Sequence, residues 1–295
     1  MPVTWGGFRQ NSRAARLTFT SVKTLPLTRA ASLTLLCWVL AKAALAQVPN
    51  QYVTAEDDLP CVEQTLSLRV HLVDDLDATP LDFDTAAFEA MVALTNEWFA
   101  PVCLDFAVCE YLREENFRYA SFEGADGEEA TSLFGDRNRI DVYVTVRDSM
   151  DRCGLATRTG VERNREAFVM IVDSCVSDIS KTLAHELGHY FGLYHTFEVE
   201  ETGEELVNGD NCLVAGDLIC DTPADPFEEG SLTRYTDSED PCRFVFRGRD
   251  ENGQFYVPHT GNVMSYYDDE CACGFTHDQL AVMAANYLAN RRGLY

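Results

Sequence analysis

Residues 185–195 constrain the fold of this chain more than any other segment. They contain three of its six histidines, and His185 and His189 are spaced to project from one face of a helix, about one turn apart. Gly192 follows, and glycine can leave a helix through a positive φ without steric cost. The chain can therefore turn back and bring His195 toward the other two histidines. A fold that contains this segment needs a helix with a sharp exit beside a polar site.

The chemistry of these side chains favours a metal ion. Three neutral imidazoles bind Zn²⁺ and leave a fourth tetrahedral position open, which is typical of catalytic rather than structural zinc. Glu186 lies next to the first histidine, angled toward the position of a metal-bound water. The alternative, histidines on a solvated helix face, does not account for the glycine and the third histidine. The sequence predicts a zinc site formed by His185, His189 and His195.

The first 46 residues differ from the rest of the chain. They carry six basic residues and no acidic one, and they contain the apolar run Leu33–Leu40 and then the Ala-x-Ala pattern of residues 44–46. This order predicts a secretory signal peptide, residues 1–46, cut after Ala46. A membrane anchor is the alternative, but the run is shorter than the ~20 residues that span a bilayer. We therefore expect a secreted or periplasmic protein, with residues 47–65 as a short lead-in or residual prosegment.

Removal of that segment leaves 17 basic and 48 acidic residues, a net charge of −31. Such a charge repels phosphate backbones and anionic membrane surfaces, so nucleic acid and stable membrane association are not expected. It favours calcium binding and cationic substrates. The sequence leaves the oligomeric state open.

Cysteine usage agrees with export. Ten cysteines follow the predicted leader, an even number that predicts up to five disulfides in an oxidising compartment. A second zinc site using Cys271 and Cys273 is the weaker alternative, because no matching cysteine pair accompanies them. The ten are Cys61, Cys103, Cys109, Cys153, Cys175, Cys212, Cys220, Cys242, Cys271 and Cys273.

Hydrophobic periodicity predicts an α/β (α+β) arrangement in which strands and helices come first and irregular sequence follows. Period-two alternation indicates a strand at Leu66–Val73, on which His71 is interpreted as structural. The other expected strands are Leu104–Val108, Ile140–Val146 and Ala167–Val172, with an edge strand at Gly154–Arg158 and a long loop from Glu110 to Asn138. Residues 66–195 would form the N-terminal catalytic subdomain, and residues 196–295 the C-terminal one.

Three helices are expected. The first is capped by Asp82 or Asp84, buries Phe88, Met91, Val92, Thr95 and Phe99, and ends before Pro101. The zinc helix is capped by Ser177 or Asp178 and buries Leu183, Leu187, Tyr190 and Phe191. A capping box, Thr276–Gln279, opens a C-terminal helix with Leu280, Met283, Ala284 and Tyr287 inside and Arg291 and Arg292 at its end.

The zinc motif resembles that of the metzincins, which carry a methionine turn downstream, here residues 262–266. Three further segments narrow the resemblance to the pappalysin-type metzincins, over roughly residues 66–287. These segments are His195-Thr196-Phe197, Gly216-Asp217 with Asp221-Thr222-Pro223, and Phe275-Thr276 with Gln279 before Met283.

The resemblance implies a metzincin-like zincin with a twisted mixed five-stranded sheet, backing and active-site helices, and an irregular C-terminal subdomain closed by one helix. It implies a secreted zinc endopeptidase with Glu186 as general base and Met264 as an apolar floor beneath the metal. Tyr266 would stabilise the developing oxyanion. Residues 154–159 would form the edge strand that pairs with an extended peptide substrate.

Family members also bind structural calcium near the Asp-Thr-Pro segment, which implies Asp217, Asp221 and Thr222 as ligands. A turn or helix cap is the alternative for these residues. In relatives that prefer Arg or Lys after the cleaved bond, an acidic residue before the next cysteine lies in the pocket. Glu270 fits that position, against the alternative of a solvated acidic turn.

Two departures from the family remain. The short lead-in leaves little room for a prosegment, and Asp57, Asp58 or Cys61 would have to block the metal, although a disulfide is favoured for Cys61. The second departure is Cys220, expected to pair with Cys271 or Cys273, and Cys212 with Cys242, a connectivity that sequence leaves open. The alternative functions are a non-catalytic binding protein on the same fold and a zinc hydrolase of substrates other than peptides.

Overall fold

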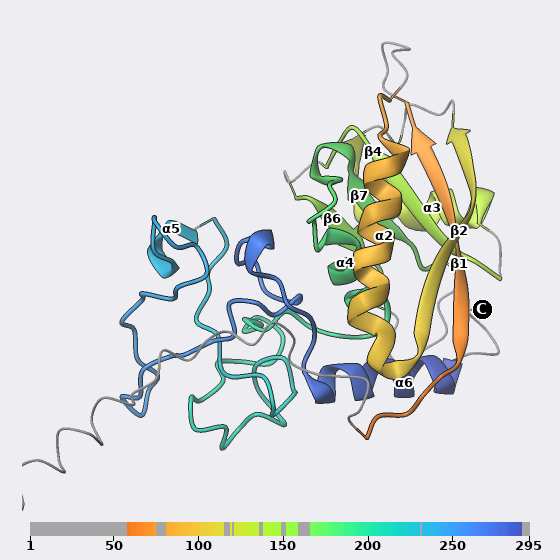
Figure 1. The fold of residues 1–295 in the computed structure, drawn as a ribbon. Helices are drawn as coiled ribbons and strands as arrows, with labels where there is room; N and C mark the ends of the chain where they lie inside the picture. Colours follow the sequence, from red (N-terminus) through yellow and green to blue (C-terminus); the bar gives the residue numbers. More distant parts are fainter. Residues whose placement is uncertain are drawn as a thin grey trace, which may run out of the picture. The chain divides into compact units, whose positions relative to one another are not determined.

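Five strands form the main sheet, in the spatial order β2-β1-β4-β7-β6 (Figure 1). Neighbouring strands run parallel except β6, which pairs antiparallel with β7 and forms one edge of the sheet. This is the predicted mixed five-stranded sheet, and the segment around Gly154 is its edge strand. The bounds are β1 Gln64–Val73, β2 Leu104–Glu114, β4 Ile140–Thr145, β6 Gly154–Ala156 and β7 Val169–Val172.

Helices cover both faces of this sheet (Figure 1). Because successive side chains of a strand point to opposite faces, Val142 and Val144 of β4 enter one core while Tyr143 enters the other. The larger core contains side chains of α2 (Thr85–Phe99), α4 (Thr182–Tyr190) and α6 (His277–Asn290). The smaller core contains Ala130 of α3 (Gly124–Phe134). The sheet is thus a rigid platform with the predicted zinc helix on its larger-core face.

Helix α2 confirms the predicted cap and buried face. The Asp84 side chain accepts hydrogen bonds from the backbone N–H groups of Ala86 and Ala87, so Asp84 rather than Asp82 is the cap. The helix passes into a short 3₁₀ turn, η2 (Ala100–Val102), that contains Pro101. All five side chains predicted to be buried are buried.

The predicted loop from Glu110 to Asn138 is wrong in most of its length. Strand β2 continues to Glu114, a two-residue strand β3 (Ser121–Phe122) pairs with β5 (Arg147–Asp148), and α3 follows. Helix α3 has no apolar stripe, because it approaches the sheet through small residues. A Cβ on Gly127 would lie 2.1 Å from the ring of Phe168. The close contact depends on a missing side chain, which hydrophobic periodicity cannot detect.

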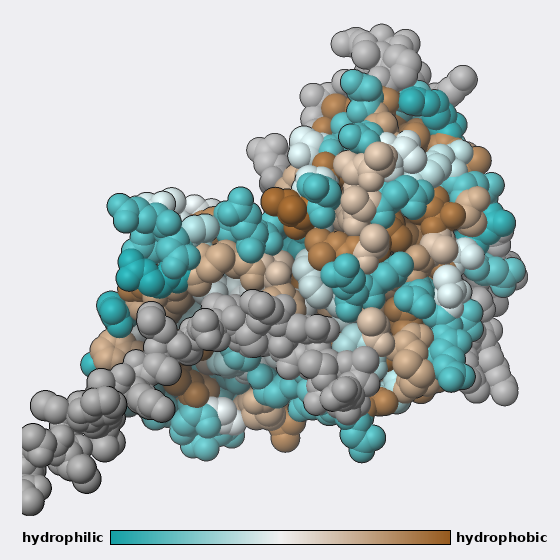
Figure 2. Space-filling view, viewed as in Figure 1, coloured by the Kyte–Doolittle hydropathy of each residue, from teal (hydrophilic) through white to brown (hydrophobic). Residues whose placement is uncertain are grey.

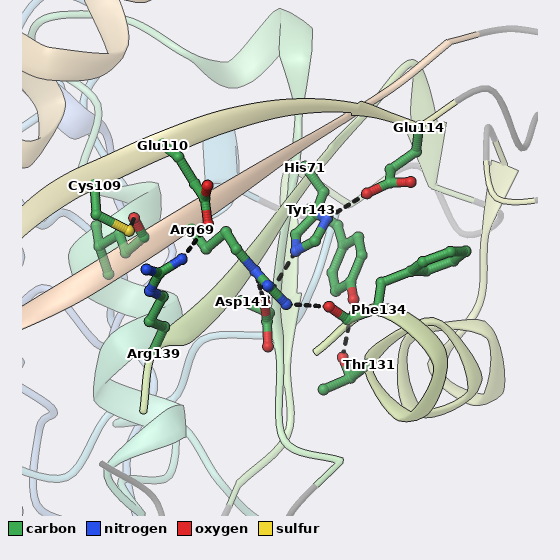
Figure 3. Close-up of polar contacts among 11 residues, drawn as sticks. Arg69, His71, Cys109, Glu110, Glu114, Thr131, Phe134, Arg139, Asp141 and Tyr143 are labelled. Atoms are coloured by element: carbon green, nitrogen blue, oxygen red, sulfur yellow. Dashed lines mark hydrogen bonds and ion pairs between the residues drawn. The ribbon is translucent and has the colours of Figure 1, made fainter. Parts of the chain in front are cut away.

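A buried polar network joins β1, β2 and β4 beneath α3 (Figure 3). Both ring nitrogens of His71 face carboxylates, with Nδ1 2.7 Å from Glu114 and Nε2 2.9 Å from Asp141. Asp141 also accepts from Arg69 Nε at 2.9 Å. Because buried polar groups require partners, this arrangement confirms the structural interpretation of His71.

The segment between α4 and α6 is largely irregular, as expected. Its short elements are α5 (Leu232–Tyr235) and the 3₁₀ turn η5 (Asp269–Cys271). An aromatic cluster formed by Phe197, Phe227, Tyr235 and Tyr267 provides its core. In Figure 2, hydrophilic residues predominate on the surface around α5. The loops of this segment, which lack regular backbone pairing, pack around the buried rings of this aromatic cluster.

Four disulfides connect the described residues, and the predicted pairings in the C-terminal half are wrong. Cys212 pairs with Cys220, and Cys242 with Cys271. The other two are Cys61–Cys103 and Cys153–Cys175, so the disulfide expected for Cys61 is confirmed. The Cys273 thiol donates instead to the Gly261 carbonyl. Cys212 and Cys220 lie in one tight loop, a proximity that residue types alone do not reveal.

The computed structural model describes residues 58–74, 81–114, 119, 121–135, 138–148, 152–158, 166–230 and 232–290. The predicted leader, most of the lead-in with Asp57, and Arg291 and Arg292 lie outside these ranges. Among the helices within them, none combines the length and apolar character needed to cross a bilayer.

Candidate active site

Helix α4 begins later than predicted. Ser177 and Asp178 lie in a preceding turn, and the helix starts at Thr182. The Ser180 hydroxyl accepts a hydrogen bond from the Thr182 N–H at 3.2 Å. The predicted buried face is confirmed, because Leu183, Leu187, Tyr190 and Phe191 are all buried. That packing fixes the rotation of the helix, and with it the direction of the histidines.

Gly192 ends the helix as the sequence predicts. Its φ is 101°, a left-handed conformation that favours glycine. Its N–H bonds to the His189 carbonyl, and the Leu193 N–H bonds to the Gly188 carbonyl, the pair of bonds that defines a Schellman motif. The chain therefore reverses within two residues, which brings His195 back to the helix.

The three imidazoles converge on one point. Nε2 of His189 lies 3.1 Å from Nε2 of His185 and 2.9 Å from Nε2 of His195. Nδ1 of His185 lies 2.7 Å from the Val263 carbonyl, and Nδ1 of His189 lies 2.9 Å from the Leu193 carbonyl. Because a carbonyl only accepts, these Nδ1 atoms carry the protons and the Nε2 lone pairs point at one another.

Such an arrangement fits a bound cation. Burial, reinforced by the neighbouring imidazoles, lowers the pKa of His185 and of His195 well below the ordinary value. Burial lowers the pKa of His189 to about 4. All three rings are therefore neutral near pH 7, as zinc ligands must be. The donor set of His185, His189 and His195 matches zinc, and carbonyl contacts orient two of the rings.

The methionine turn lies directly beneath this site. Met264 is fully buried, and a Cβ on Gly188 would lie 2.4 Å from its sulfur, so the glycine lets the turn reach the helix. The Asn262 side chain accepts from the Met264 N–H at 2.8 Å and donates to Gln279 of α6 at 2.9 Å. Thr276 and Gln279 form the predicted capping box, which anchors this support.

Tyr266 and Glu186 complete the immediate surroundings. The Tyr266 ring centre lies 4.8 Å from that of His195 and 5.4 Å from that of His185. Burial and the nearby Glu186 carboxylate raise the pKa of Tyr266, so its hydroxyl keeps a proton to donate. Both residues line a cavity of about 440 Å³ beside the imidazoles. The site thus combines a metal-binding triad, a carboxylate, a phenol and space for a ligand.

Known proteins resemble this chain in sequence and in fold. A family model described as pregnancy-associated plasma protein-A matches residues 158–288, and one described as reprolysin-like metallo-peptidase family M12B matches residues 119–196. An extracellular metalloprotease of Arthroderma benhamiae is 23% identical over 245 residues, covering 78% of this chain and 74% of the relative. Human pappalysin-1 is 33% identical over 106 residues, which is 35% of this chain and 6% of pappalysin-1. Together these matches support a pappalysin-type metzincin.

The solved structure of mirolysin in complex with compound 9 shares the fold of this chain, with a TM-score of 0.52 and 18% identity. The match covers 80% of this chain and 94% of mirolysin. Family and relatives together make the protein a metalloendopeptidase. The family implies zinc, and His185, His189 and His195 form a three-histidine site that could hold a metal ion.

The lining of the cavity differs from the prediction at one residue. Asp269, not Glu270, lines the cavity beside the zinc site, together with Glu229, Arg152 and Lys181. The 3₁₀ turn η5 places successive side chains in different directions, and Glu270 is exposed. Lys181 is buried in the cavity wall, and burial lowers its pKa to about 8. Sequence spacing located the acidic turn but not the side chain that points inward.

Asp225 is a residue near the site that the sequence did not indicate. Its carboxylate accepts from the Thr196 hydroxyl at 2.8 Å and from the Tyr267 hydroxyl at 2.8 Å. It therefore ties the residue after the third histidine to the segment after the methionine turn. Burial raises its pKa to about 6. No local motif marks it, because its partners are distant in sequence.

The structure brings the expected calcium ligands only partly together. Asp217 accepts from the Thr222 hydroxyl at 2.8 Å, whereas Asp221 accepts from Thr276 and from the Asp278 N–H at the start of α6. Glu205, which the sequence did not indicate, is buried near Asp217. Within the described part of the chain, Glu205 Oε2 and Asp217 Oδ2 lack hydrogen-bond partners. Two such carboxylate oxygens are hard ligands suited to calcium.

The edge strand β6 lies against the carboxylate of Glu186, so a side chain added to the strand at Gly154 should displace that carboxylate. A Cβ on Gly154 would lie 2.4 Å from Glu186 Oε1. Gly154→Ala should displace that carboxylate and lower kcat about 10- to 100-fold with little change in KM. Zinc content should stay at one ion per chain. Steady-state kinetics with metal analysis measure this.

The matched control is Leu155→Ala, because Leu155 packs in the smaller core on the opposite face of the sheet. This change should leave kcat nearly unchanged. Wild-type kcat in the Gly154→Ala enzyme would contradict the positioning of Glu186 by the strand.

Proposed function

We propose that this pappalysin-type metzincin is a secreted zinc endopeptidase in which Glu186 is the general base. The observation that carries the proposal is the convergence of three Nε2 atoms next to the cavity that Glu186 lines. Glu186 is 5% exposed, so its carboxylate faces the site rather than bulk solvent.

The residues of the chain would divide the reaction between them. Zinc, when held by the three histidines, supplies a Lewis acid that activates water and polarises a peptide carbonyl. The Glu186 carboxylate accepts the proton that water loses and later passes it to the departing amine. The Tyr266 hydroxyl donates to the oxygen on which negative charge develops. Met264 gives the site an apolar floor.

An extended peptide is the substrate that the strand arrangement supports. Strand β6 is at the edge of the sheet, and Cys153 and Gly154 line the same cavity as Glu186. An edge strand presents backbone N–H and C=O groups to a partner strand, so a peptide can add to it by β-augmentation. That addition would place one peptide bond over the zinc site.

Acidic groups support a preference for Arg or Lys after the cleaved bond. Glu229 and Asp269 line the cavity, and they replace Glu270 as the source of negative charge in this proposal. A cationic side chain entering the cavity would gain an ion pair with either carboxylate.

Export and calcium binding belong to the same proposal. The four disulfides and relatives named extracellular metalloproteases support export, with residues 1–46 as the signal peptide. For calcium, the close approach of the Gly216 backbone to Glu205 supports the proposal. The φ of Gly216 is 62°, and a Cβ there would lie 2.5 Å from Glu205 Oε2. Glu205, Asp217 and Thr222 would hold the ion, and Asp221 would cap α6.

A digest tests the proposed function directly. The mature protein should cleave casein, and a zinc chelator should abolish cleavage until zinc is restored. Mass spectrometry of the products should show Arg or Lys enriched immediately after the cleaved bonds. Undigested casein with one zinc per chain would overturn the endopeptidase, while chelator-sensitive cleavage before large apolar residues would overturn only the basic preference.

A further inference from the structure

Lys181 is a buried cation in the wall of the substrate cavity. It immediately precedes α4 and lies one helical turn before His185, and its side chain is only 7% exposed. It lines the cavity together with the imidazole of His185 and the carboxylate of Glu186. A lysine that is buried in a binding cavity needs a reason, because removal of an ammonium group from water is unfavourable.

The partners of the ammonium group come from another segment that lines the same cavity. Lys181 Nζ donates a hydrogen bond to the Tyr267 carbonyl and lies 3.8 Å from Asp269 Oδ1. Both partners belong to the segment after the methionine turn. The Asp269 side chain is 38% exposed, so the two charges form a pair with its cation buried and its anion open to the cavity.

This pair changes what the cavity offers to a substrate. A basic side chain that enters to meet Asp269 must share that carboxylate with Lys181 and approaches a second positive charge. An acidic side chain meets Lys181 itself. The remaining charged residues of the wall, apart from Glu186, are Arg152 and Glu229, which carry opposite charges. Lys181 and Asp269 therefore decide the balance of positive and negative charge that the cavity wall presents to a substrate side chain.

We propose that Lys181 is a specificity-determining residue, which offsets the charge of Asp269 and restrains the preference for Arg or Lys after the cleaved bond. The inference rests on the proposed endopeptidase function. The substrate class that follows is a peptide whose side chain at this position is basic or uncharged, rather than strictly basic.

The test compares three peptides that differ only after the cleaved bond, where they carry Arg, Leu or Glu. Lys181→Met should raise the ratio of kcat/KM for the Arg peptide over the Leu peptide about tenfold, because Asp269 is then fully available. Asp269→Asn should lower that ratio by a similar factor and improve cleavage of the Glu peptide, because Lys181 is then without its carboxylate. Glu270→Gln, at the exposed neighbour, is the matched control and should leave all ratios unchanged.

Unchanged ratios in folded Lys181→Met enzyme, or a lowered Arg-to-Leu ratio, would overturn the proposal. If that variant does not fold, Asp269→Asn decides alone, because Lys181 keeps the Tyr267 carbonyl, and unimproved cleavage of the Glu peptide there overturns the proposal too. Calorimetric binding of the same peptides in a Glu186→Gln background should show Kd ratios that move in the same directions. Absence of chelator-sensitive cleavage by the wild type would refute the proposed endopeptidase function. The ratios of Kd would still test whether Lys181 determines specificity.

Discussion

Replacement of Glu186 by glutamine is expected to lower kcat/KM on a peptide substrate by about 10³-fold or more. Glutamine has the same shape, so the contact with Gly154 and the packing of α4 should persist. The amide cannot accept the proton that water loses, and the acid–base steps at both ends of the reaction are lost together. Steady-state kinetics, zinc analysis and thermal unfolding of both proteins measure the change.

Because Glu186 is not a zinc ligand in this arrangement, the variant should retain one zinc per chain and an unchanged Tm. Glu128→Gln on the exposed face of α3 is a suitable control, and its kcat/KM should equal that of the wild type. An active Glu186→Gln enzyme would assign the base to another residue. Loss of zinc in that variant would assign Glu186 a ligand role instead.

The features predicted correctly from the sequence are those with short-range causes. His185 and His189 share a helix face because of the helical repeat, and Gly192 turns the chain because only glycine tolerates its φ at no cost. Thr276 and Gln279 form their two reciprocal hydrogen bonds within one helical turn. Each signal lies within a few residues, so the local sequence contains all the information.

Features that depend on distant chain segments were missed or misplaced. Helix α3 approaches the sheet through Gly127, and a missing side chain leaves no periodic pattern. Asp225 acquires its role from two loops that meet only in the folded chain. Asp269 and Glu270 have similar chemistry and adjacent positions, and only the backbone direction in η5 decides which one lines the cavity. The sequence shows that two acidic residues lie in this turn, and only the tertiary structure shows which of them lines the cavity.

Removal of calcium is expected to lower the Tm of the mature protein by about 5–10 °C, as the loss of a ligand bound well above its Kd would do. Glu205 and Asp217 are 5% and 2% exposed, and a cation offsets the cost of burying both carboxylates. Calorimetry after treatment with a calcium chelator measures the change. Calcium should restore the Tm, whereas zinc alone should not, and a Tm that calcium does not affect would contradict the site.

The pH dependence of the calcium-free protein provides an independent check on the same residues. Burial raises the pKa of Glu205 to about 8, with a contribution from the Asp217 charge, and burial raises that of Asp217 to about 7. Because these folded pKa values exceed the unfolded ones, the folded state holds protons that the unfolded state releases, and this stabilisation is lost as pH rises toward 8. The Tm without calcium should therefore fall between pH 5 and pH 8 more steeply than the Tm with calcium, since the bound ion offsets both charges.

Asp217→Asn should flatten the calcium-free curve and weaken the response to calcium, while Asp210→Asn, at an exposed carboxylate in the neighbouring loop, should change neither. Parallel curves with and without calcium would show that these carboxylates do not bind the ion.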